Sequence, residues 1–264
     1  MNILTPVLDH VVVDVHDRLD AAVETYGGLG FALTDRGRHT IGSANHLAMF
    51  ATNYLELLGW EAGYTPPRPD ISLAKFAPGL NGLVLRMDDA DELFAQLTAA
   101  GLPVVEPMSF SRPVELPTGV EDARFRTIRF QTGFLENIRF YFCQHLTPQL
   151  VWRDEWLTHE NSAADVVRVV LVAEDASRLA KLFATICGAD RVSTTDEGCS
   201  LRAENASIDV VRKADLARMF GTAAPDLGTR DECMAALTLR APQLAQRRVV
   251  PAAQAMNVTL EFVP

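Results

Sequence analysis

The chain has 264 residues, of which 48% are hydrophobic and 22% are charged, as in folded globular proteins. Its formal net charge of −10 at pH 7 argues against a nucleic acid or an anionic membrane surface as a partner, because both attract basic proteins. The sequence has no run of about 18 apolar residues and no pattern of a secretion signal. We therefore expect a cytoplasmic protein without a membrane span, whose four cysteines are reduced and buried.

The first sixty residues predict the order strand, helix, strand, strand, strand. Residues 7–15 are apolar and β-branched, which is typical of a strand. Apolar residues at helical spacing between positions 19 and 26 predict a helix, and the glycines that follow at 27–30 end it. Three short strands are then predicted at residues 31–35, 46–51 and 54–58.

This order of elements recurs along the chain, and a recurring order predicts an array of similar βαβββ modules. A second module is predicted at residues 80–145, and a third begins with a strand at 166–173 and a helix at 175–187. Strand-like stretches at 233–239 and 257–263 predict a partial fourth module.

These modules predict two domains. Residues 1–150 would form one domain, in which the modules at 7–60 and 80–145 pair, and residues 151–264 would hold the third module and the partial fourth. The best candidate for a linker contains Trp152 and Trp156, which we expect to pack across the seam between the domains.

A histidine in the first strand and a glutamate in the last strand of a βαβββ module resemble the vicinal-oxygen-chelate superfamily. Here these residues are His10, within residues 8–12, and Glu56, within residues 54–57. Further stretches that resemble its glyoxalase-like group are residues 37–39, 42–45, 142–148 and 151–152. The resemblance covers roughly residues 7–175 and implies an α+β fold, with curled mixed sheets around a cleft.

In metal-dependent members of that superfamily, ligands from the first and last strands of paired modules hold a divalent metal that chelates two adjacent substrate oxygens. The resemblance therefore implies that His10 and Glu56 hold iron, manganese, nickel or zinc. Both side chains can share one face of the sheet, because alternate residues of a strand do so. An ionised glutamate on that face is costly unless it is paired. The alternative is a buried, purely structural His10–Glu56 hydrogen bond.

The later modules do not repeat this pair. Alignment of the strands places Gly82 where the first module has His10, and Tyr141 where it has Glu56. The corresponding residues of the third module are Arg168 and Asp209. The sequence therefore supplies only half of the usual ligand set.

Other polar residues near the first module complete the predicted site. His39 and His46 flank a turn, and histidines can exchange protons near neutral pH. We predict His39 as a catalytic residue beside His10 and Glu56. The predicted substrate-binding residues are Arg38, Asn45, His46, Tyr141 and His145.

Three functions stay open at this point. The favoured one is an enzyme, a lyase, isomerase or dioxygenase, that acts on a small oxygenated metabolite in a cleft between paired modules. The second is a protein of the same fold that binds a drug or an antibiotic without catalysis. Tyr141 and the incomplete ligand set favour this second function. The third is a structural scaffold that forms a homodimer through exposed strand edges.

Overall fold

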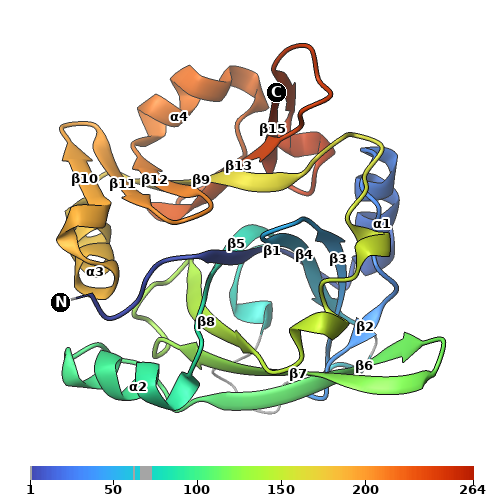
Figure 1. The fold of residues 1–264 in the computed structure, drawn as a ribbon. Coiled ribbons are helices and arrows are strands. Elements are labelled where there is room, and N and C mark those ends of the chain that lie inside the picture. The colour runs from blue at the N-terminus through green and yellow to red at the C-terminus, as the bar shows by residue number, and fades with distance from the viewer. Residues whose placement is uncertain (1, 62, 66–72) are drawn as a thin grey trace.

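The computed structural model of the chain describes residues 2–61, 63–65 and 73–264. Two curled mixed sheets lie one above the other, and a few helices cover their ends and faces (Figure 1). No helix in these residues is long and apolar enough to cross a membrane. The structure confirms the predicted α+β fold with curled mixed sheets.

The first sheet is built from residues 8–145. Its strand order is β2 (Gly37–Arg38), β3 (Ser43–Met49), β4 (Tyr54–Trp60), β1 (Leu8–His16), β5 (Gly79–Arg86), β8 (Arg139–His145), β7 (Gly119–Arg129) and β6 (Met108–Leu116). Two half-sheets meet at the antiparallel pair β1–β5, and in each half the first strand runs parallel to the last, as β1–β4 and β5–β8. Helices α1 (Leu19–Gly28) and α2 (Ala90–Ala99) follow β1 and β5.

The second sheet is built from residues 165–263 and repeats this plan. Its strand order is β10 (Val192–Thr195), β11 (Gly198–Arg202), β12 (Ser207–Val211), β9 (Asp165–Ala173), β13 (Glu232–Arg240), β15 (Thr259–Val263) and β14 (Arg248–Val250). Helix α3 (Ser177–Cys187) follows β9, and a further helix, α4 (Lys213–Phe220), precedes β13. The predicted boundary near residue 150 stays a prediction.

The main core lies between the two sheets. Alternate residues of the central strands, such as Val11 of β1 and Val169 of β9, are fully buried in one continuous apolar cluster. Polar contacts also tie the sheets together, because the Asn53 side chain accepts from the Val166 amide at 3.0 Å and donates to its carbonyl at 2.9 Å. The four cysteines are buried and unpaired, as expected.

The two sheets differ on their concave faces. The first sheet curls almost into a barrel, because its edge strands β2 and β6 approach each other, and the Thr40 amide next to β2 donates to the Ser111 carbonyl of β6 at 2.9 Å. In the second sheet, Leu216 and Phe220 of α4 pack on the concave face against the valines of β9. The concave face of the first sheet is thus free to form a cavity, whereas α4 occupies that of the second.

One expectation about local structure was wrong, and two elements were not predicted. Residues 31–35 form no strand, because Thr34 uses its backbone and its hydroxyl in irregular hydrogen bonds to Leu47. Strand β6 was not predicted, since its sequence is rich in serine and charge. Helix α4 was not predicted either, because polar residues and loop-forming glycines surround it.

Candidate functional site

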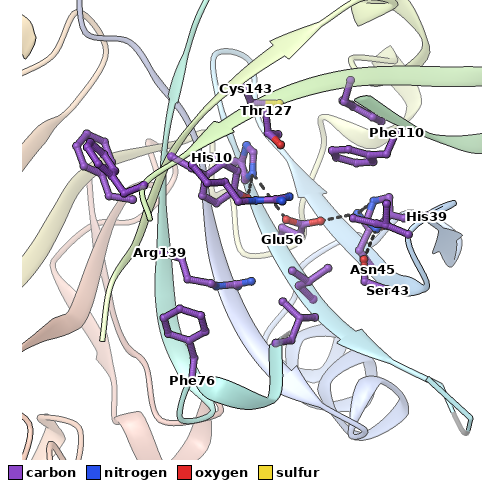
Figure 2. A pocket seen from close by; sticks show the side chains of 18 of the residues that line it. His10, His39, Ser43, Asn45, Glu56, Phe76, Phe110, Thr127, Arg139 and Cys143 are labelled. Atoms are coloured by element: carbon purple, nitrogen blue, oxygen red, sulfur yellow. Dashed lines mark hydrogen bonds and ion pairs between the residues drawn. The ribbon is translucent and has the colours of Figure 1, made fainter. Parts of the chain in front are cut away.

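A cavity of about 320 Å³ lies inside the first sheet. Its lining contains five of the eight predicted site residues, namely His10, His39, Asn45, Glu56 and Tyr141. Figure 2 labels the first four of them. Aromatic and aliphatic side chains make up much of the remaining wall, including Leu58, Phe76, Phe110, Phe125 and Phe140. A mostly apolar cavity with a few convergent polar groups is typical of a small-molecule site.

Asp9 occupies an irregular position next to His10. The pairing of β1 with β5 shifts register between Leu8 and His10, so Asp9 is an extra residue in β1, as in a β-bulge. This bulge brings two sequence neighbours together, and Nδ1 of His10 lies 2.7 Å from Oδ2 of Asp9. Without the bulge, adjacent side chains would point to opposite faces of the sheet.

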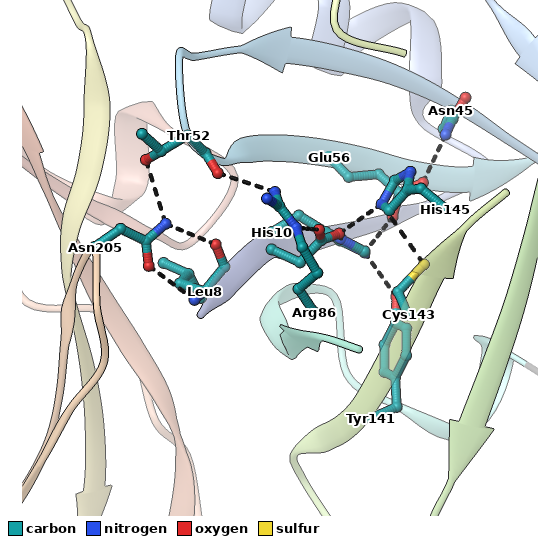
Figure 3. Close-up of polar contacts among 11 residues, drawn as sticks. Leu8, His10, Asn45, Thr52, Glu56, Arg86, Tyr141, Cys143, His145 and Asn205 are labelled. Carbon is teal, nitrogen blue, oxygen red and sulfur yellow. Dashed lines mark hydrogen bonds and ion pairs between the residues drawn. The ribbon is translucent and has the colours of Figure 1, made fainter. Parts of the chain in front are cut away.

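The buried Asp9 carboxylate accepts hydrogen bonds from three side chains, His10, His145 and Arg86, which Figure 3 labels. His145 contacts Oδ2 through its Nε2 at 2.8 Å, and Arg86 donates to Oδ1 through its Nε at 2.9 Å. Burial alone would raise the pKa of Asp9, but His145 and His10 together hold this pKa well below its usual value. Asp9 is therefore a carboxylate that can only accept hydrogen bonds.

This contact fixes the orientation of His10. Since Asp9 only accepts, Nδ1 of His10 must carry the hydrogen, and in the neutral ring Nε2 then has a free lone pair. That Nε2 accepts a hydrogen bond from the Tyr141 hydroxyl at 3.1 Å and lies 3.7 Å from Oε2 of Glu56. The His10 ring also stacks on Tyr54, with ring centroids 4.4 Å apart. His10 thus presents a fixed proton acceptor to the cavity.

Glu56 is held by a second polar chain that comes from β3. Its Oε1 accepts from Nδ2 of Asn45 at 2.6 Å. The same Nδ2 lies 3.3 Å from Nε2 of His39, and Nδ1 of His39 lies 2.8 Å from the Ser43 hydroxyl. A continuous polar path therefore runs from Ser43 to Asp9, and it passes Glu56 and His10 on the cavity wall.

His39, the histidine at the Ser43 end of this polar path, is neutral in the folded protein at pH 7. Burial lowers the pKa of His39 to about 4, and Arg112 adds to this effect, although Glu56 opposes it. A neutral His39 can accept a hydrogen bond from Asn45 through Nε2, which leaves the second amide hydrogen of Asn45 for Glu56. His39 thus acts on Glu56 through Asn45.

We expect His39 to make folding sensitive to acid. The unfolded chain protonates His39 near pH 6.5, whereas the folded chain resists protonation down to about pH 4. The unfolded state therefore binds more protons in this interval, and the free energy of unfolding should fall by about 2–3 kcal/mol as pH drops through it. Urea unfolding at pH 7 and pH 4.5 should show a smaller loss in His39→Gln than in the wild type. Equal losses would contradict this role.

Two predicted substrate-binding residues are not brought to the cavity. His46 lies on the opposite face of β3 from Asn45, where its Nδ1 contacts the Thr34 carbonyl at 2.8 Å and Arg36 donates to its Nε2. The Arg38 side chain is 61% exposed and pairs with Glu61 at 2.9 Å. Neither belongs to the cavity lining, so neither is placed to contact a ligand inside this cavity.

His145 lies behind His10 rather than in the cavity. It reaches Asp9 from β8 and borders a shallow surface pocket with Arg86 and Trp152. Trp152 does not pack between the two sheets as expected, because its ring lies edge-on to His145 and Tyr54. Both residues therefore support the site from behind.

The sequence did not single out Asp9, Arg112, Arg129 or Arg139, although Asp9 supports the site from behind and the three arginines line the cavity. The only available signal for Asp9 was its position beside His10, and strand alternation argued against a shared face. The three arginines lie in β6, β7 and β8, whose sequences repeat no ligand of the first module.

The donor atoms of His10 and Glu56 fit a divalent cation. Nε2 of His10 and Oε2 of Glu56 face each other at 3.7 Å, and both line the cavity. The lone pair of Nε2 now accepts from the Tyr141 hydroxyl, so a cation would take the place of that hydrogen bond. A second group, Asp9, Cys143 and His145, has its ligand atoms within 4.8 Å of one another. Both oxygens of Asp9 already accept hydrogen bonds there, and burial raises the pKa of the Cys143 thiol, which keeps it protonated. The first pair is therefore the better candidate for holding a metal.

The fold and this cavity define a protein of the vicinal-oxygen-chelate superfamily. Residues 8–187 match the family of the glyoxalase-like domain, and the chain belongs to that family. No curated protein matches the chain.

Two solved structures are similar over the whole chain. A hypothetical protein from Staphylococcus aureus is 15% identical, with a TM-score of 0.73 over 97% of this chain and 98% of that one. A mutant of 4-hydroxymandelate synthase from Streptomyces coelicolor is 12% identical, with a TM-score of 0.55 over 98% and 93% of the two chains. At these identities the likeness shows the fold alone.

Proposed function

We propose that this protein is an enzyme, a lyase or an isomerase, that moves a proton on a small oxygenated metabolite bound in the cavity of the first sheet. One observation carries this proposal: Nε2 of His10 faces the cavity while the Asp9 carboxylate fixes Nδ1. A carboxylate that orients an imidazole in this way fixes its tautomer and stabilises the imidazolium that forms on proton uptake.

The neighbouring side chains have complementary roles in this proposal. His10 would accept a proton from a carbon or hydroxyl next to a substrate carbonyl. Burial raises the pKa of Tyr141, so its hydroxyl stays protonated. Once His10 takes up a proton, its Nε2 no longer accepts from this hydroxyl, which can then donate to a substrate oxygen. Asn45 holds Glu56 in place, and Glu56 would orient the substrate and stabilise the protonated His10.

His10 and Glu56 are also the residues that would hold a divalent metal, with iron, manganese, nickel and zinc as candidates. Such an ion would supply Lewis acidity toward the substrate oxygens. The geometry favours proton transfer over oxygen activation, because iron oxygenases commonly use two histidines and one carboxylate. Among the described residues, the other cavity histidine, His39, is bonded to Asn45.

Proton transfer can be tested through exchange with solvent. The protein would be incubated in D2O with a pool of small hydroxy and keto acids, with and without each divalent metal, and deuterium uptake at carbon would be followed by NMR. We expect uptake in the wild type and in His46→Gln, whose histidine faces away from the cavity, and a loss of about 100-fold or more in His10→Gln. Equal uptake in all three proteins would refute the role of His10.

A second candidate function is binding without turnover, as in proteins that sequester a drug or an antibiotic. It is supported by the large apolar share of the cavity wall and by Gly82 and Tyr141, which stand where a second histidine and carboxylate would be expected. Compounds that raise the melting temperature without any deuterium uptake or product would favour this function over the enzyme.

A further inference from the structure

Arg112 is a buried cation in the wall of the cavity. It lies on β6, is 7% exposed, and lines the same cavity as His10 and Glu56. Glu56 attracts this guanidinium across the cavity, but among the described residues no side chain forms a hydrogen bond or ion pair with it, although such a group carries five donors. Burial of a cation without a directly bonded anion is costly, and burial lowers the pKa of Arg112 despite Glu56. The position of Arg112 therefore favours an anion bound directly to its guanidinium.

The guanidinium stem is held in place by its packing. A β-carbon on Gly37 would lie 2.8 Å from Cδ of Arg112 and 2.4 Å from Oδ1 of Asn45, so the β2 backbone presses against both side chains. Arg112 therefore lies beside the polar chain of His39, Asn45 and Glu56, and its charge opposes protonation of His39. A ligand bound to Arg112 would lie next to the proposed reaction centre.

The whole lining carries more positive than negative charge. Its cationic side chains are Lys75, Arg112, Arg129 and Arg139, and its carboxylates are Glu56 and Glu136, which gives four charges against two. The protein itself has a net charge of −10, so this excess runs against the overall composition. Nη2 of Arg139 is buried and has no hydrogen-bond partner in the described structure, and it lies 3.8 Å from Asp14. The lining is thus electrostatically suited to an anion.

An apolar wall adjoins this charged region. Phe110 and Phe125 stack with ring centroids 5.2 Å apart, and both line the cavity. Phe110 also lies edge-on to His39, with centroids 5.3 Å apart. The occupant that fits both features has an anionic group at one end and a flat apolar body at the other.

We propose that the cavity takes a small carboxylate with an aromatic or similarly flat apolar body, and that Arg112 binds its carboxylate group. A carboxylate offers two oxygens in one plane, which matches the two parallel N–H groups of a guanidinium. This proposal names the substrate class of the proposed enzyme. Only the reaction rests on the proposed function, because binding of the carboxylate requires neither a metal nor turnover.

The test uses metal-free protein and measures thermal unfolding. Benzoate, phenylacetate and mandelate would each be compared with the corresponding amide and with chloride at equal ionic strength. We expect at least one acid at 10 mM to raise the melting temperature by about 3 °C or more, through preferential binding to the folded state, while its amide has a much smaller effect. Equal shifts for acid and amide, or no shift with any acid, would overturn the proposal.

Two arginine variants locate the effect. Arg112→Met should lose the shift and should melt at or above the wild-type temperature without ligand, because an unpaired buried charge is gone. Arg126→Met is the matched control, since Arg126 lies on the neighbouring strand and pairs with Asp91 outside the cavity; it should keep the shift. A shift retained in Arg112→Met, or in Arg112→Gln if the first variant does not fold, would also overturn the proposal. His10→Gln should keep the shift, which separates binding from the proposed reaction.

Discussion

Replacement of Asp9 by alanine is expected to lower the free energy of unfolding by about 3–5 kcal/mol, as for loss of one partner in a buried ionic network. Three buried or half-buried groups, His10, His145 and Arg86, would lose their common acceptor. Solvent water does not reach this position to replace the lost acceptor, because the Asp9 side chain is completely buried. Urea unfolding at pH 7 measures the change directly.

A surface carboxylate provides the control for this variant. Asp20 also pairs with an arginine, Arg36, but its side chain is 92% exposed, so Asp20→Ala should cost less than about 1 kcal/mol. If Asp9→Ala costs no more than Asp20→Ala, the buried network does not stabilise the fold as described. Asp9→Ala should also release the His10 ring, which NMR would detect as a change in the tautomer of its two nitrogens.

The second large effect is expected at Gly82, on the β5 strand opposite Val12. A β-carbon at Gly82 would lie 2.4 Å from Cβ and 2.5 Å from Cγ2 of Val12, so Gly82→Ala forces the two central strands apart. We expect a loss of about 2–3 kcal/mol in the free energy of unfolding, as for other overpacked cores. Gly27→Ala, in helix α1 with open space around it, should instead be neutral or slightly stabilising.

A double variant tests the stated cause. Val12→Ala removes the methyl groups that the new β-carbon would meet, so Gly82→Ala should cost much less in the Val12→Ala background than in the wild type. An unchanged cost in both backgrounds would show that the contact with Val12 is not responsible. The same contact explains the one-sided site, because no side chain fits at Gly82, where the second half-sheet would otherwise place a counterpart of His10.

The sequence predicted the general plan of the fold because each module repeats the same hydrophobic pattern. The sequence also placed His10 and Glu56 close together, as the structure does. The strands β1 and β4 pair in parallel, and strand alternation puts both side chains on the same face of the sheet. Strand alternation could further have separated Asn45 from His46, because neighbours on a regular strand cannot both face the cavity. The structure places Asn45 inside and His46 outside.

Two parts of the site lay beyond a reading of sequence patterns. The bulge at Asp9 depends on how β1 pairs with β5, a strand more than sixty residues away, and no local pattern reports it. Arg112 lies on an edge strand next to Pro113, so its burial depends on the curl that brings β6 next to β2. Both features come from tertiary contacts rather than from local propensity.

Helix α4 has a consequence for the number of ligands that the chain can hold. Arg168 and Asp209, the counterparts of His10 and Glu56 in the second sheet, pair with each other at 2.5 Å, and α4 covers the neighbouring surface. Although the chain contains two sheets of similar plan, within the part of the chain that the structure describes only the first has an open concave face that can hold a ligand. Calorimetric titrations should therefore saturate at one ligand per chain, with no second, weaker equivalent and no cooperativity between the two halves.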